Sequence, residues 1–90
     1  MAKGVRKTEV VDIVVAEPFK LDVLLADGHS ARVDVQQHLW GPVFEPLRDP
    51  AMFAQGKFEP ELGTIVWPNG ADFSPEFILD AALAARNAAG

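Results

Sequence analysis

Residues 10–35, VVDIVVAEPFKLDVLLADGHSARVDV, contain three short runs of apolar and β-branched residues separated by turn signals. The first run stops before Pro18, because proline has no N–H to donate to a strand ladder. The second and third runs alternate apolar and polar residues, which is typical of strands with one buried face. Between them, Asp27 and Gly28 tolerate the positive φ of a hairpin turn. The segment therefore predicts a three-stranded antiparallel meander.

The polar positions of this meander indicate which face meets water. Arg32 and Asp34 alternate with apolar residues in the third run, and Asp22 does so in the second. We expect these three side chains to share the solvent face. Opposite charges that face each other across strands contribute about 0.2 to 1 kcal/mol.

After residue 35 the alternation ends and prolines become frequent. The sequence from Gln36 to Asp49 is too rich in proline for a long regular element. Four of its apolar residues are expected to cover one edge of the core; they are Trp40, Val43, Phe44 and Leu47. Asp49 followed by Pro50 then predicts the N-cap and first residue of a short helix.

The remaining chain predicts a second hairpin and a longer helix. Phe58 and the run 65–67 flank a Glu-Pro-Glu-Leu-Gly turn, which indicates two further strands. Ser74 precedes a proline and an acid at the start of an alanine-rich segment, which predicts a capped helix to about residue 85. The predicted class is α+β, with two layers: a three-stranded antiparallel meander, a short helix, a second β-hairpin and a C-terminal helix.

The C-terminal helix carries apolar residues on more than one side. Its main predicted stripe passes through Ile78 and Ala82, while Leu79 and Leu83 fall outside that stripe at 100° per residue. One explanation is that these leucines are covered by the loop near Trp40 or are partly exposed. The other is a protein contact through the helix, with a second copy of the chain or with a different protein.

Length and composition limit the classes of protein to which this chain can belong. Ninety residues, 49% of them hydrophobic, predict one small globular domain without a transmembrane segment. The net charge of −5 conceals an asymmetry, because residues 1–7 hold three of the eight basic side chains and none of the 13 acids. We expect a basic, flexible tail at residues 1–7 and one acidic domain at residues 8–90. Cysteine is absent, which excludes disulfides and thiolate chemistry. Without an apolar signal segment near its start, the chain is expected to be cytoplasmic.

The residues that could carry chemistry form no catalytic pattern. His29 and His38 match no metal-ligand spacing, and the serines lie in no nucleophile motif. Glu59 and Glu61 could form a carboxylate pair, but a domain of this size rarely encloses the cleft that such a pair requires. The five basic residues after the tail are scattered, so we expect nucleic acid to be bound weakly or only through a partner. The sequence predicts no enzyme, cofactor, metal site or membrane contact.

The richest stretch for binding is the turn from Trp67 to Asp72. A large aromatic side chain, a tight turn and an acid lie within six residues, as in the lip of a binding site. Each also has a structural explanation: Trp67 can pack on the core, Asn69 can support the turn, and Asp72 can accept hydrogen bonds from nearby amides. Both interpretations remain open from the sequence.

Three segments occur in an order shared with a known family. They are FEPLRD at residues 44–49, IVWPNGAD at residues 65–72, and Ser-Pro-Glu at residues 74–76. Over residues 8–80 the chain resembles the bacterial domain-of-unknown-function 2442 family. The resemblance implies a small α+β domain of this architecture, and for some members a place in toxin and antitoxin gene pairs or fusion to a helix-turn-helix domain. It implies no catalytic residues.

Two hypotheses of function follow. The first is a protein-interaction domain, antitoxin-like or regulatory, that binds a protein partner through its acidic surface or forms a homodimer. Its candidate contact residues are Trp67, Asn69, Asp72, Leu79 and Leu83. The alternative is a domain that binds a small ligand, or is weakly catalytic, and uses the turn from Trp67 to Asp72.

Overall fold

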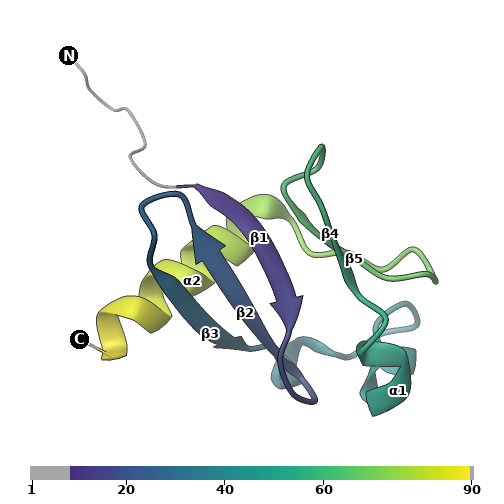
Figure 1. Ribbon diagram of the computed structural model, residues 1–90. Coiled ribbons are helices and arrows are strands. Elements are labelled where there is room, and N and C mark those ends of the chain that lie inside the picture. Colours follow the sequence, from purple (N-terminus) through teal and green to yellow (C-terminus); the bar gives the residue numbers. More distant parts are fainter. Residues whose placement is uncertain (1–8, 90) are drawn as a thin grey trace.

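The computed structural model describes residues 9–89, so the expected tail at residues 1–7 lies outside the described part. A twisted three-stranded sheet lies in front of the long C-terminal helix, and a small second hairpin stands beside the sheet (Figure 1). This is the predicted α+β arrangement of two layers.

The meander is confirmed. It consists of β1 (Val10–Val15), β2 (Lys20–Leu25) and β3 (Ser30–Asp34), antiparallel in the order β1-β2-β3. The hairpin between β2 and β3 turns through Gly28, whose φ of 92° explains why glycine suits this position. One face of the sheet presents buried apolar residues, while the other presents Asp22 opposite Arg32, as predicted.

Short helical segments connect the two sheets. They are η1 (Gln36–His38), η2 (Glu45–Arg48) and α1 (Pro50–Phe53). Asp49 caps α1 as predicted, because its carboxylate accepts a hydrogen bond from the Ala51 amide at 3.0 Å. The second hairpin is also confirmed and pairs β4 (Lys57–Glu59) with β5 (Thr64–Val66).

The last element, α2 (Pro75–Ala89), lies across the sheet and packs chiefly on β3. The Ser74 hydroxyl accepts a hydrogen bond from the Phe77 amide at 3.1 Å, which confirms the predicted cap. The helix continues beyond the expected end near residue 85. A single core joins the sheet, α2 and the second hairpin; its fully buried larger side chains include Leu21, Leu25, Leu39, Leu47, Phe53, Ile65, Trp67 and Ile78.

The expectation for the segment at residues 40–47 was only half right. Leu47 is buried and Phe44 packs against the core, with its ring stacked 5.0 Å from that of Phe73. Trp40 and Val43, however, are 67% and 49% exposed. Neither side chain belongs to the core cluster or packs against it.

Candidate functional site

The turn after β5 is a compact structural element. The Trp67 amide donates to the Ala71 carbonyl at 2.9 Å, and the Gly70 amide donates to the Trp67 carbonyl at the same distance. Gly70 has a φ of 90°, and Asp72 forms a β-bridge with Val66 on the returning segment. The turn therefore closes on itself, with the backbone bonds of a hairpin.

Trp67 belongs to the core and not to a binding lip. Its side chain is 2% exposed, and its indole N–H donates to the Phe53 carbonyl at 2.8 Å. The rings of Phe53 and Phe73 lie 5.5 and 5.9 Å from it. Because its ring is buried and its indole N–H is hydrogen-bonded inside the protein, Trp67 has almost no exposed surface and no free polar atom with which to contact a ligand.

Asn69 uses both ends of its side-chain amide to join two loops. Its Nδ2 donates to the Val43 carbonyl at 3.0 Å, and its Oδ1 accepts from the Ala71 amide at 3.1 Å. Asn69 thus connects the turn after β5 to the segment that carries Trp40. Asp72 is exposed at the edge of the same turn.

The segment that carries Trp40 is held at both ends. The carbonyl of buried Leu39 accepts a hydrogen bond from Arg48 Nε at 2.6 Å, and the Val43 carbonyl accepts the bond from Asn69. Gly41, with a φ of 91°, makes the turn in between, and its carbonyl accepts from the amide of Phe44. We call residues 39–44 the Trp40 loop. It presents a large aromatic side chain to solvent on a fixed backbone.

The two leucines of α2 lie differently from expectation. Leu79 is 5% exposed and belongs to the core, so the expectation that it lies outside the buried stripe was wrong. Its neighbours around a small surface hollow include Val10 at the start of β1 and Gly63 before β5. Leu83 is partly buried against the same core.

The remaining polar candidates do not assemble into a reactive group. His29 lies at the exposed hairpin turn, with Nδ1 3.2 Å from an oxygen of Asp27. His38 packs edge-on against the ring of Phe77, at 4.8 Å between centroids. Glu59 and Glu61 are exposed on the second hairpin. Within residues 9–89 no three His, Asp or Glu side chains are grouped so that they could hold a metal ion.

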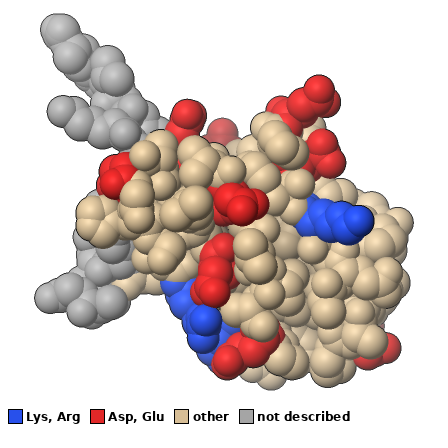
Figure 2. All heavy atoms as spheres, viewed as in Figure 1, with Lys and Arg blue, Asp and Glu red and all other residues tan. Residues whose placement is uncertain are grey.

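The outer face of the meander carries paired charges. Arg32 Nε donates to Asp22 at 2.9 Å, and Glu17 lies 3.7 Å from the same guanidinium. The hydrogen bond from Arg32 lowers the pKa of Asp22 below its usual value, and the same bond raises the pKa of Arg32. Lys20 lies 3.9 Å from Asp34. In the view of Figure 2 acidic side chains are spread over the surface, and basic ones appear in fewer places.

A match to a family model covers residues 10–84, and the family is described as "Protein of unknown function (DUF2442)". The chain belongs to the DUF2442 family. The match includes the meander, the Trp40 loop, both strands of the second hairpin and α2 as far as residue 84, so it spans most of the described two-layer domain. No curated protein and no solved structure matches the chain. In the described part of the DUF2442 domain, no helix is both long enough and apolar enough to cross a bilayer.

The positions of two residues of interest were not predicted from the sequence. Trp40 was expected to cover the core, and Arg48 was regarded as one of several scattered cations. Both lie in the irregular part of the chain, where no periodicity indicates which side chains point inward.

Proposed function

We propose that this domain binds a protein partner and that Trp40 is the main anchor of the contact. The observation that carries the proposal is a tryptophan two thirds exposed on a loop whose backbone is held by Arg48 and Asn69. Tryptophan is enriched among the residues that dominate binding energy in protein interfaces. A side chain already fixed at its base loses less conformational entropy on binding.

The neighbourhood of Trp40 supports a contact of mixed character. Val43 adds apolar surface on the same loop, and Pro42 between them is exposed. Residues 8–90 contain five basic and 13 acidic side chains, which gives this part of the chain a net charge of −8. The partner that fits best is a small protein with an apolar pocket for the indole and basic residues around it. An antitoxin-like or regulatory role, as the family resemblance implies, would use such a contact.

The small-ligand alternative loses its main residue, because Trp67 is buried and its indole N–H is engaged. Leu79 is likewise unavailable as a contact on the surface. Asn69 keeps a part in the proposal, but as a support for the Trp40 loop.

The proposal can be tested by affinity capture from the native host with matched variants. Leu62 provides the control, since it is 54% exposed but lies on the second hairpin. A partner bound through Trp40 should be recovered by the wild type and by Leu62→Ala and lost with Trp40→Ala. Its recovery should also fall at high salt if basic residues contribute. Equal recovery of every protein by all three would refute the proposal. Sedimentation velocity of the wild type shows whether the partner is a second copy.

A further inference from the structure

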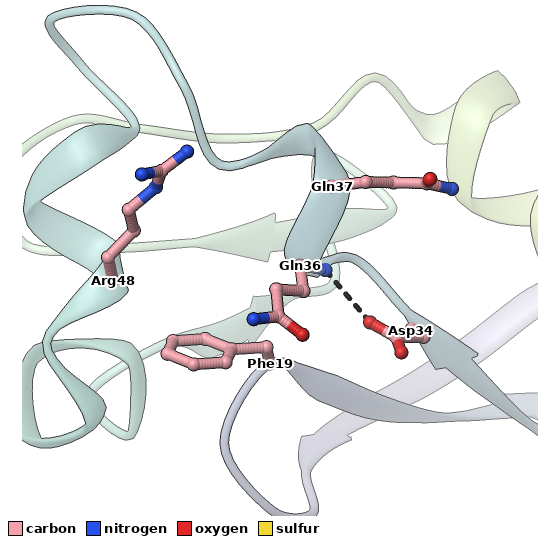
Figure 3. Close-up of a pocket in the computed structure, with 5 residues that line it drawn as sticks. All are labelled: Phe19, Asp34, Gln36, Gln37 and Arg48. Carbon is pink, nitrogen blue, oxygen red and sulfur yellow. Dashed lines mark hydrogen bonds between the residues drawn. The ribbon is translucent and has the colours of Figure 1, made fainter.

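A hollow of about 690 Å³ opens on the surface between the end of β3 and the end of η2. Its lining residues are Phe19, Asp34, Gln36, Gln37 and Arg48 (Figure 3). They come from the turn before β2, from the end of β3, from η1 and from η2. Its volume is in the range of sites that accept small organic groups.

Arg48 is the distinctive charge of this hollow. Its Nε is committed to the Leu39 carbonyl, which fixes the direction of the guanidinium. Among the described residues, Lys20 and Arg32 form ion pairs with carboxylates, whereas Arg48 and Lys57 form none. The terminal nitrogens of Arg48 therefore remain as donors, in the planar geometry that pairs with a carboxylate.

Phe19 forms an apolar wall at the opposite side and holds an unusual backbone conformation. Its φ is 72°, in a turn closed by the hydrogen bond from the Lys20 amide to the Glu17 carbonyl. This position of a turn normally favours glycine, and residues kept in such conformations concentrate at functional sites. The ring packs edge-on against Phe53 at 5.5 Å and also lines the hollow. Figure 3 shows the Gln36 amide beside the ring.

We propose that this hollow binds a carboxylate carried on an apolar group. The carboxylate pairs with the terminal nitrogens of Arg48, the apolar group lies against Phe19, and the Gln36 amide supplies a further donor. The carboxylate of Asp34 already accepts from the Gln36 backbone amide and lies near Lys20. Its negative charge in the same hollow favours a ligand with a single negative charge over a phosphate, since like charges repel.

The proposal is tested by a nitrogen–proton NMR titration of the whole chain with N-acetylphenylalanine and with its uncharged amide. We expect the acid to shift the amide signals of residues 19, 36, 37 and 48, with a Kd near the millimolar range, about the strength of one such ion pair with a small apolar contact. The amide should produce no such shifts. A tripeptide that ends in phenylalanine distinguishes the sources: equal or tighter binding points to the C-terminus of a protein chain, and loss of binding points to a free small acid.

Three variants separate the site from general effects on the fold. Arg48→Lys keeps the charge but loses the planar fork, and Gln36→Glu adds a competing carboxylate without touching the bond from Arg48 to Leu39. Each should weaken binding roughly tenfold, the effect of losing a charge-assisted hydrogen bond. Arg32→Lys, on the outer face of the sheet, is the matched control and should bind like the wild type. Absence of localised shifts up to about 20 mM, equal shifts with the amide, or binding unchanged in both hollow variants would overturn the proposal.

Discussion

Replacement of Trp67 by phenylalanine should destabilise the domain by roughly 3 kcal/mol. The indole N–H donates to the Phe53 carbonyl at 2.8 Å, and that carbonyl also accepts a longer bond of 3.2 Å from the Gly56 amide. The carbonyl is therefore not left without a partner, and the lost bond accounts for only about 1 kcal/mol. The smaller ring leaves a cavity among Phe53 and Phe73, which adds roughly 2 kcal/mol at about 0.8 kcal/mol for each buried carbon group.

The same substitution at Trp40 is the matched control. Trp40 is 67% exposed, and its loop is held by the side chains of Arg48 and Asn69 and not by the indole, so Trp40→Phe should change stability by less than about 0.5 kcal/mol. Urea unfolding followed by circular dichroism measures both variants and does not depend on the fluorescence of the residue replaced. Equal effects at the two positions, or a loss below about 1 kcal/mol at Trp67, would show that the indole is not the buried, bonded side chain described above.

Three further predictions concern single contacts. Gly56→Ala places a Cβ 2.7 Å from the buried indole and should cost about 1 to 3 kcal/mol in urea unfolding, although its backbone conformation admits alanine. Thr64→Val removes the hydroxyl that donates to the Phe73 carbonyl at 2.7 Å and should cost about 1 to 3 kcal/mol in urea unfolding. Asp22→Asn removes the carboxylate paired with Arg32. Because the pKa of Asp22 is lowered from 3.8 in the folded state, the stability it contributes is present at neutral pH and lost as the pH falls below that value. Unfolding measured across pH should therefore show a small penalty for Asp22→Asn that disappears in acid and shrinks with salt.

The regular elements could be predicted because each carries a local signal. The alternation in β2 and β3 places every second residue on the core face, and this pattern is confirmed by the buried Leu21, Val23 and Leu25. The caps at Asp49 and Ser74 are decided by one side chain and one amide, so they too are visible in a short stretch of sequence.

The orientation of α2 could not be predicted in the same way. A helical wheel ranks faces by their own apolarity, but burial depends on what surrounds the helix. Ile78 and Ala82 face the sheet as expected, while Leu79 is enclosed near the start of β1 and the turn before β5. The turn of the second hairpin thus lies beside Leu79 as well. Its position relative to α2 is set by tertiary packing, which the periodicity of the helix sequence does not indicate.

The two tryptophans differ in how far the neighbouring sequence indicates their burial. Trp67 follows a strand and lies two residues after Ile65, which is buried as Trp67 is, with the half-buried Val66 between them. Trp40 has no such neighbour pattern, because the chain from η1 to η2 is held by bonds between distant residues: Arg48 to Leu39 and Asn69 to Val43. Those bonds fix a loop that leaves an indole in water and, through the same Arg48, hold a guanidinium at the edge of the hollow that Phe19 also lines. Sequence rules fail most often where a protein departs from them for function. The misjudged side chain of Trp40 and both proposed sites lie at one end of the domain, whereas Leu79 lies beside Val10 and Gly63. The variants at Trp40 and at Gln36 therefore test two uses of one irregular surface.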